Sequence, residues 1–221
     1  METAAVSAWP EAAGFVLAGG RSSRMGRDKA LLPFAGRTLI EQALAILREA
    51  GLPASIAGAR SPLAAFAPVV EDAHPGLGPL SGICAALQST SAQTAVLIPV
   101  DLPLIPASLI VYLLHHARTT GRAVTIPSIN GFAQTFPAVL DRAALRALAY
   151  ELESGRRGCF AAFQAAAAHC GQPLTVLPVE LLVQSGHVAH PRGLPPSRWF
   201  LNLNTEEDLR RAQHHLAAPI A

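Results

Sequence analysis

The stretch from 94 to 100, TAVLIPV, is apolar at nearly every position and rich in β-branched residues. Such a run is typical of a strand that is covered on both faces, as in parallel sheets flanked by helices. A strand of this kind needs a layer of helices on each side of its sheet. We therefore expect an α/β fold of three layers, in which helices cover both faces of a mostly parallel sheet.

Strand-like and helix-like segments alternate along the rest of the chain, as this fold class requires. In the first helix-like segment, apolar residues at helical spacing share one face before Gly51 ends the helix: Leu39, Ala43, Ile46 and Leu47. We expect further strands at 14–17, 53–58, 67–72, 122–128, 133–140 and 199–204. We expect further helices at 80–90, 106–118, 141–152, 158–170 and 205–216, with a loop rich in Pro and Gly at 184–198.

The size and charge of the chain limit what it can be. Its 221 residues, of which 51% are hydrophobic and 14% charged, suffice for one substantial core. We expect a flexible tail over 1–13 and a single domain over 14–221. The net charge of +2 is too small for a surface that binds nucleic acid. The longest apolar tract contains Asp101 and three prolines, which argues against a membrane span.

The cysteines and the N-terminal segment indicate in which cellular compartment we expect the protein. Cys84, Cys159 and Cys170 are widely spaced and fit neither a disulfide framework nor a zinc-finger spacing. The first residues have neither the basic region nor the long apolar region of a signal peptide. We therefore expect a cytoplasmic protein.

A cluster of positive charge follows the first expected strand. Four cations fall within nine residues, with Asp28 as the only acid among them: Arg21, Arg24, Arg27 and Lys29. Glycines before and within this loop would let backbone N–H groups approach phosphate oxygens. The loop lacks the Walker A spacing and the GxGxxG pattern. It is either an anion-binding loop, which we favour, or an ordinary charged surface loop.

The stretch from 17 to 32, LAGGRSSRMGRDKALL, resembles the signature of the molybdenum cofactor guanylyltransferases, which are nucleotidyltransferases acting on nucleoside triphosphates. Later segments resemble the same family: VVEDAHPGLGPLSGICAAL (69–87), LIPVDLPLIPASLI (97–110), AQTFPAVL (133–140), SGRRGCFAAF (154–163) and FLNLNTEEDL (200–209). The resemblance covers about residues 14–212 and implies a Rossmann-like nucleotidyltransferase fold. It also implies an enzyme that transfers GMP from GTP to molybdenum-bound molybdopterin and releases pyrophosphate.

The candidate catalytic residues are Arg24, Lys29 and Asp101. A carboxylate at the end of an apolar strand is a poor core residue unless it is paired, but it is a good ligand for Mg²⁺. Asp101 could instead cap the helix that begins near Pro106, although an N-cap should directly precede its helix. The resemblance makes Asp101 the metal-binding aspartate, with Mg²⁺ as the cofactor.

The resemblance also implies a set of residues that contact the nucleotide. These are Leu17, Ala18, Gly19, Gly20, Lys29, Asp72, Gly78, Pro79, Leu80 and Asp101. From the residues alone, Asp72 could merely begin an Asx turn. The LAGG opening favours GTP, since related cytidylyltransferases have LAAG there. Gly58 stands where the family often has an asparagine, so a side-chain contact with the nucleotide would be lost.

The acceptor side rests mainly on the segment 200–209. Asn202 and Asn204 alternate with leucines, which would place both amides on one face of a strand. The resemblance implies that these amides and Gln134 bind the pterin acceptor, with Arg156 and Arg157 as weaker candidates. The alternative is turn chemistry before a helix capped by Thr205.

Two other functions stay open at this point. The first is a related nucleotidyltransferase, either a molybdopterin cytidylyltransferase or an enzyme acting on sugar phosphates. The second is a non-catalytic module that binds a nucleotide or a pterin. The expected partners are GTP, the molybdopterin acceptor, and proteins of molybdenum insertion and molybdoenzyme maturation, without nucleic acid or membrane.

Overall fold

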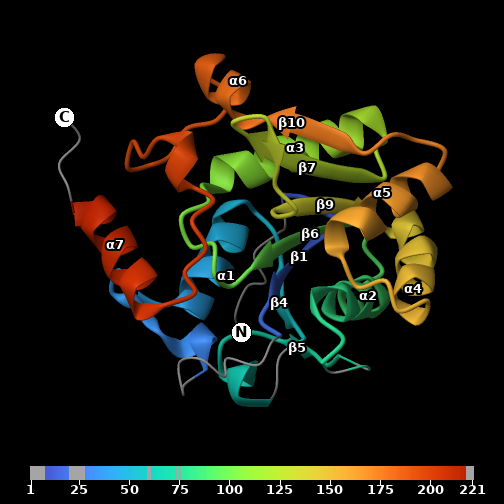
Figure 1. Cartoon of the computed structure of the whole chain (residues 1–221), viewed down its shortest axis with the longest axis horizontal. Coiled ribbons are helices and arrows are strands. Elements are labelled where there is room, and N and C mark those ends of the chain that lie inside the picture. Colours follow the sequence, from blue (N-terminus) through green and yellow to red (C-terminus); the bar gives the residue numbers. More distant parts are fainter. Residues whose placement is uncertain (1–7, 20–27, 59–60, 73, 75, 218–221) are drawn as a thin grey trace.

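The structure, a computed structural model, describes residues 8–19, 28–58, 61–72, 74 and 76–217. Among these residues, eight strands form one sheet, seen edge-on in Figure 1. Its strands are β1 (Ala12–Leu17), β4 (Ala54–Ala57), β5 (Val69–Val70), β6 (Thr94–Pro99), β7 (Val124–Ile129), β8 (Phe132–Ala133), β9 (Ala138–Asp141) and β10 (Thr175–Pro178). A separate two-stranded ribbon consists of β2 (Pro33–Phe34) and β3 (Arg37–Thr38).

Strand β1 lies in the interior of the sheet, between β4 and β6 and parallel to both. The full order is β10-β7-β9-β6-β1-β4-β5, with β8 paired to β7. Only β8 and β9 run against the others in this sheet. The predicted mostly parallel sheet is therefore confirmed. The carboxyl ends of β1, β4, β5, β6 and β7 all open onto one edge, where α/β sheets bind their ligands.

Helices cover both faces of the sheet, which confirms the three-layer prediction (Figure 1). One face carries α1 (Leu39–Glu49), α3 (Ala107–Thr120), α6 (Val179–Gln184) and α7 (Glu206–Ala217). The other carries α2 (Pro79–Ser89), α4 (Leu145–Glu153) and α5 (Cys159–His169). Short 3-10 turns occupy η1 (Lys29–Leu31), η2 (Ser61–Ala65), η3 (Arg142–Ala144) and η4 (Pro196–Arg198).

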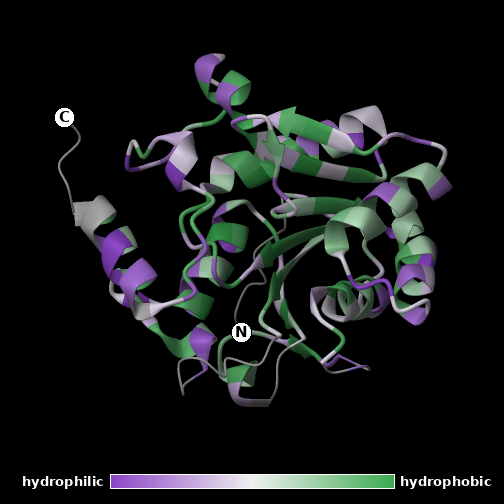
Figure 2. Ribbon diagram, in the orientation of Figure 1, coloured by the Kyte–Doolittle hydropathy of each residue, from purple (hydrophilic) through white to green (hydrophobic). Residues whose placement is uncertain are grey.

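The alternation of side chains along β1 explains the two cores. Val16 belongs to the core that contains residues of α1 and α3, whereas Phe15 and Leu17 belong to the core that contains residues of α2. Gly14 gives α1 a close approach, because a Cβ at this position would lie 3.0 Å from the side chain of Leu47. Apolar residues therefore dominate the strands and the helix faces turned toward them (Figure 2).

The N-terminal boundary differs from the prediction. Strand β1 begins at Ala12, two residues before the expected start at 14. Trp9 packs on the core and donates its indole N–H to the carbonyl of Ala50 over 2.9 Å. From residue 8 onward, the predicted flexible tail is therefore part of the packed domain, while residues 1–7 lie outside the described ranges. No helix in the described ranges is long and apolar enough to cross a bilayer.

Two local predictions were wrong, and some elements were not predicted. The expected strand at 199–204 is a turn at 199–200 followed by irregular residues at 201–204, which pair with no strand of the sheet. The expected strand at 133–140 is interrupted, and its parts become β8 and β9. The region after 170 also contains β10 and α6, neither of which was predicted, because β10 has only four residues and is not apolar throughout.

Candidate active site

Strand β1 ends at Leu17, and the segment predicted to bind the nucleotide follows it in the sequence. Two backbone hydrogen bonds extend the strand pairing here: Ala18 N–H donates to Ala57 over 3.0 Å, and Val100 N–H donates to Leu17 over 3.1 Å. The segment after β6 therefore stays beside the segment after β1. This pairing brings Asp101 to the same edge as Gly19, as the strand-end argument predicts.

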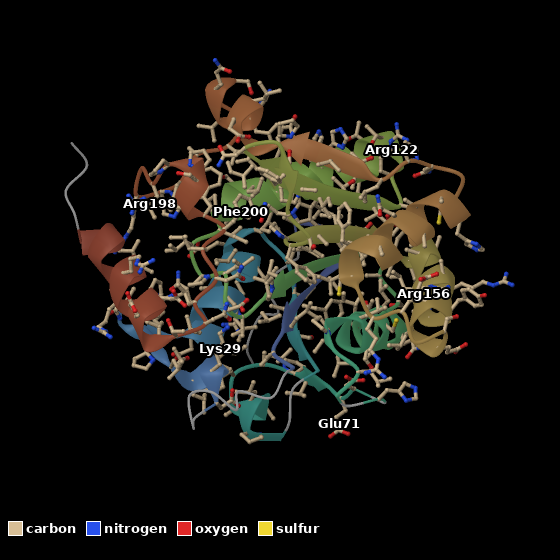
Figure 3. The ribbon with its side chains drawn as sticks, viewed as in Figure 1. Lys29, Glu71, Arg122, Arg156, Arg198 and Phe200 are labelled. Atoms are coloured by element: carbon tan, nitrogen blue, oxygen red, sulfur yellow. The ribbon has the colours of Figure 1, made fainter. Side chains whose placement is uncertain are left out.

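Lys29 joins three segments that are far apart in the sequence. It begins η1, whose N-cap Asp28 accepts a hydrogen bond from the Ala30 backbone over 3.0 Å. Lys29 Nζ lies 2.8 Å from Asp101 Oδ2 and 2.6 Å from Asn204 Oδ1. Figure 3 shows Lys29 at this edge of the molecule. The structure thus brings together one residue of the predicted triphosphate loop, the predicted metal ligand and one predicted acceptor residue.

Asn204 lies beside Lys29 although its segment does not form the predicted strand. The Leu203 N–H donates to the carbonyl of Asp101 over 3.0 Å, and the Leu203 side chain is buried. Asn202 and Asn204 are exposed. The expected alternation of buried leucine and exposed amides is therefore present, although the segment is not part of a sheet.

Asp101 is not a helix cap. The N-cap of α3 is Pro106, so the alternative role for Asp101 is excluded. Its side chain is 22% exposed and paired with the ammonium of Lys29. Among the described residues, no group of three or more His, Cys, Asp or Glu side chains forms a ready metal cage. Asp101 therefore offers a single carboxylate beside the expected phosphate position.

Three glycines let the backbones of neighbouring segments approach closely. A Cβ on Gly19 would lie 2.8 Å from the carbonyl oxygen of Gly58, and Gly58 itself approaches Gly82 of α2. Gly58 has a φ of +74°, a conformation that asparagine adopts more readily than most residues. An asparagine, which the resemblance places here, would therefore fit this backbone conformation, with Gly19 in ordinary contact at 3.4 Å.

Asp72 follows β5 and forms the Asx turn that was its alternative interpretation. Its carboxylate accepts a hydrogen bond from the His74 backbone over 2.8 Å, and it also accepts one from the hydroxyl of Ser81. Asp72 thereby ties the end of β5 to the first turn of α2. Gly78 caps this helix with a φ of +90°, and Pro79 occupies its first position. The roles of these residues and of the buried Leu80 toward a nucleotide stay predictions.

Ser81 was not predicted from the sequence. A serine within an apolar helix gives no distinct signal, and only its contact with Asp72 marks it. A cavity of about 290 Å³ opens beside this pair, between α2 and α4. Cys84 and Arg157 also line the cavity. Burial raises the pKa of the Cys84 thiol to about 11, which makes this cysteine a poor nucleophile at neutral pH.

Arg156 does not face the phosphate edge as a free cation. Its Nε and Nη2 atoms donate to the two carboxylate oxygens of Glu151 over 2.6 and 2.8 Å. The guanidinium also lies over the ring of Tyr150, on the side of α4 shown in Figure 3. Glu151 is buried, so this ion pair gives Arg156 a structural role, and its weaker candidacy for the acceptor stays a prediction.

Gln134 lies farther along the same edge of the sheet. Its backbone N–H donates to Pro127 near the carboxyl end of β7, and its side chain donates to the carbonyl of Phe132. Strand β7 lies two strands from β6, or about 10 Å at the usual spacing. No described contact joins Gln134 to Lys29 or Asp101. Its acceptor role stays a prediction, and Gly20 and Arg24 lie outside the described residues.

Comparisons with known proteins match this architecture. The model of the MobA-like NTP transferase domain matches residues 14–170. A molybdenum cofactor guanylyltransferase from Xanthomonas euvesicatoria pv. vesicatoria is 49% identical over 102 residues, which span 46% of this chain and about half (52%) of that relative. A probable molybdenum cofactor guanylyltransferase from Haloferax mediterranei is 31% identical over 207 residues, which span 90% of this chain and 91% of that relative.

A solved structure shares the fold. Molybdopterin-guanine dinucleotide biosynthesis protein A from Archaeoglobus fulgidus superposes with a TM-score of 0.70 at 23% identity, over 91% of this chain and 96% of that chain. The family model covers more than half of the chain, and its matched range includes both Lys29 and Asp101. The chain therefore belongs to the MobA-like NTP transferase family.

Proposed function

We propose that this enzyme transfers GMP from GTP to molybdenum-bound molybdopterin, forming the guanine dinucleotide cofactor and pyrophosphate. The observation that carries this proposal is the contact of Lys29 with both Asp101 and Asn204. A cation, a carboxylate and an amide that converge at the carboxyl edge of a parallel sheet suit a phosphate group placed between a nucleotide and an acceptor.

The bond changes require little covalent chemistry from the protein. An oxygen of the acceptor's terminal phosphate attacks the α-phosphorus of GTP in line. A new P–O bond forms as the bond from the α-phosphorus to the bridging oxygen breaks, and pyrophosphate leaves with that electron pair. A phosphate monoester is already largely ionised at neutral pH, so no general base is needed. Positioning and neutralisation of charge therefore dominate catalysis.

Lys29 is the residue best placed to neutralise charge on the triphosphate. Its ammonium is held at 2.8 Å from Asp101, so it is already oriented before a nucleotide arrives. A charge-assisted contact with the triphosphate would supply affinity and orientation together. Arg24 and the backbone amides of Gly19 and Gly20 would extend this cradle along the polyphosphate, and Leu17 and Ala18 would lie beside the nucleotide at the end of β1.

Asp101 fits a magnesium ion of the kind that nucleotidyltransferases use. Mg²⁺ in such sites commonly binds one or two carboxylates, keeps several waters and takes its other ligands from substrate phosphates. The single, partly exposed carboxylate of Asp101 matches this donor set. When bound, the ion would supply a Lewis acid that stabilises charge on the phosphate oxygens. Lys29 would share or release its contact with Asp101 as the carboxylate takes up its ligand.

The guanine base and the acceptor lie on either side of the phosphates in this proposal. Asp72 and the turn at Gly78, Pro79 and Leu80 would face the nucleoside, with base recognition mainly by backbone groups. Asn202, Asn204 and Gln134 would face the pterin. We place the reaction in the cytoplasm, supported by three cysteines that are unpaired in the fold. Delivery of the product would involve proteins of molybdoenzyme maturation.

Base choice and acceptor choice test this function directly. Competition binding should rank GTP above CTP and ATP, and pyrophosphate should be released only when GTP and the molybdopterin acceptor are both present. A preference for CTP would assign a molybdopterin cytidylyltransferase, and turnover with sugar 1-phosphates would assign a sugar-phosphate enzyme. Nucleotide binding without pyrophosphate release in the presence of acceptor would leave a non-catalytic binding module.

A further inference from the structure

We propose that Asp208, in the first turn of α7, is a positioning residue that fixes Asn204 and, through it, the ammonium of Lys29. This inference rests on the proposed function, in which Lys29 binds the triphosphate. It gives α7, the last helix among the described residues, a part in nucleotide binding that the sequence does not suggest.

The carboxylate of Asp208 binds the backbone at Asn204 and Thr205. Asp208 Oδ2 accepts hydrogen bonds from the N–H groups of Asn204 over 3.0 Å and Thr205 over 2.9 Å. In return, the Thr205 hydroxyl accepts the N–H of Asp208 over 3.1 Å. This is a capping box in which aspartate stands where glutamate is usual. The shorter side chain reaches two N–H groups at once.

The same segment is anchored on its other side. The N–H of Leu203 donates to the carbonyl of Asp101, and the Leu203 side chain is buried in the core. The residues on both sides of Asn204 are thus held by hydrogen bonds, and its own N–H is bound by Asp208. The direction of its side chain therefore depends on Asp208, and Asn204 Oδ1 accepts from Lys29 Nζ over 2.6 Å.

A continuous chain of contacts results, which runs from Asp208 to Asn204, then to Lys29 and on to Asp101. Lys29 is a flexible four-carbon side chain whose position costs conformational entropy to fix. Two anchors, Asp101 and Asn204, restrict it more than the ion pair alone. The hydrogen bond from Thr205 lowers the pKa of Asp208, so this carboxylate is ionised at neutral pH and remains a good acceptor.

The test uses the full chain and isothermal titration with GTP and with GMP. Asp208→Ala should lower the affinity for GTP about tenfold and leave the affinity for GMP nearly unchanged, because a misplaced Lys29 affects only phosphates beyond the first. Asp208→Glu restores the usual capping-box residue and should recover most of the GTP affinity. Glu207→Gln is the matched control, since it removes a neighbouring charge of α7 whose exposed partner is Arg211. It should bind GTP as the parent does.

The double variant Lys29→Ala with Asp208→Ala separates the two proposals. If Asp208 acts through Lys29, the double variant should bind GTP no more weakly than Lys29→Ala alone. Losses that multiply would overturn the positioning role. If Asp208→Ala only lowers the melting temperature and leaves GTP affinity intact, Asp208 is merely a helix cap. If Lys29→Ala itself leaves GTP binding unchanged, the failure lies in the proposed function of Lys29, and the inference fails with it.

If Asp208→Ala does not fold, Asp208→Asn replaces it in the same titrations. Asparagine keeps the side-chain volume of aspartate and one of its acceptor oxygens. Its expected GTP affinity lies between those of the parent and Lys29→Ala, and a value equal to the parent would contradict the need for the carboxylate.

Discussion

The backbone N–H of Leu203 donates to the backbone carbonyl of Asp101 over 3.0 Å. This hydrogen bond joins the segment before α7 to the loop after β6, at the edge where the parallel strands end. Next to this bond, Asn204 Oδ1 accepts a hydrogen bond from Lys29 Nζ over 2.6 Å. The same Lys29 Nζ lies 2.8 Å from Asp101 Oδ2. Lys29, Asp101 and Asn204, the predicted phosphate, metal and acceptor residues, therefore meet at one point, and a change at one of them should affect its neighbours.

Asp101→Asn should leave the protein folded and lower turnover on the order of 10²-fold or more, by analogy with the loss of one electrostatic stabiliser. Asparagine keeps the shape but removes the negative charge that a hard divalent ion requires. GTP affinity without metal should change little or rise, because a carboxylate near a bare triphosphate is repulsive. Pyrophosphate release over a series of Mg²⁺ concentrations measures this effect.

Asp141→Asn is the control for this experiment. Asp141 ends β9 opposite Thr94, at the other end of β6, and its carboxylate accepts the N–H of Ala143. Its replacement should lower stability and spare the dependence on Mg²⁺. Near-parental turnover of Asp101→Asn at limiting Mg²⁺ would remove the metal-ligand role of Asp101.

Lys29→Ala should lower the affinity for GTP far more than the affinity for GMP. Loss of a charge-assisted phosphate contact costs about 1.5–3 kcal/mol, which corresponds to roughly tenfold to over a hundredfold in affinity. Calorimetric titration with the two nucleotides measures the difference. Arg37→Ala removes a cation from β3 and should change neither affinity. Equal losses for GTP and GMP in Lys29→Ala would place Lys29 away from the outer phosphates.

Asn202→Ala and Asn204→Ala should have different effects, although both residues are predicted to bind the acceptor. Asn204 also contacts Lys29, so its replacement should raise the KM for the acceptor and weaken GTP as well. Asn202→Ala should raise only the acceptor KM. Steady-state kinetics with each substrate varied in turn distinguish them, and a pure loss of thermal stability in both variants would favour the turn-chemistry alternative.

Gly19→Ala should lower the free energy of unfolding by about 1–3 kcal/mol, the usual cost of overpacking. The added Cβ would lie 2.8 Å from the backbone oxygen of Gly58, which no side-chain rotation can relieve. Gly82→Ala is the matched comparison, since its nearest contacts are at 3.7 Å. Urea unfolding should show Gly82→Ala to be as stable as the parent or more so, because alanine favours the helix. Equal unfolding curves for the parent and Gly19→Ala would contradict the close approach.

Arg156→Gln should destabilise the fold without changing the KM for either substrate. The guanidinium of Arg156 holds the pKa of Glu151 below its usual value. Because this folded-state pKa is lowered, the stabilisation is fully present above the unfolded pKa of glutamate, about 4.3, and is lost as the pH falls through the folded value. The difference in unfolding midpoint between parent and variant should thus be constant near pH 7 and shrink below pH about 4. A raised acceptor KM in Arg156→Gln would instead support an acceptor role for Arg156.

The chain's local patterns determined the layered fold and the edge of the sheet at which the candidate site lies. The apolar run at 94–100 predicted a buried strand, and the glycine-opened loop after β1 predicted where phosphate chemistry would gather. The first inference is confirmed by β6, and the second stays a prediction. Both could be made because the side-chain pattern of a strand and the backbone freedom of glycine are properties of neighbouring residues. The ends of parallel strands then converge at one edge, so Asp101 could be placed beside the loop without any knowledge of distant contacts.

The partners of individual side chains were decided only by the tertiary structure. The alternation in 200–204 predicted a strand, yet the sheet offers no neighbour for it, and the segment is held instead by one hydrogen bond to Asp101 and by Asp208. Arg156 resembles a phosphate ligand in the sequence but pairs with Glu151, whose burial favours a bidentate partner. Lys29 and Asn204 meet across 175 positions of sequence. Such contacts depend on how whole elements pack, and no local pattern of residues encodes them.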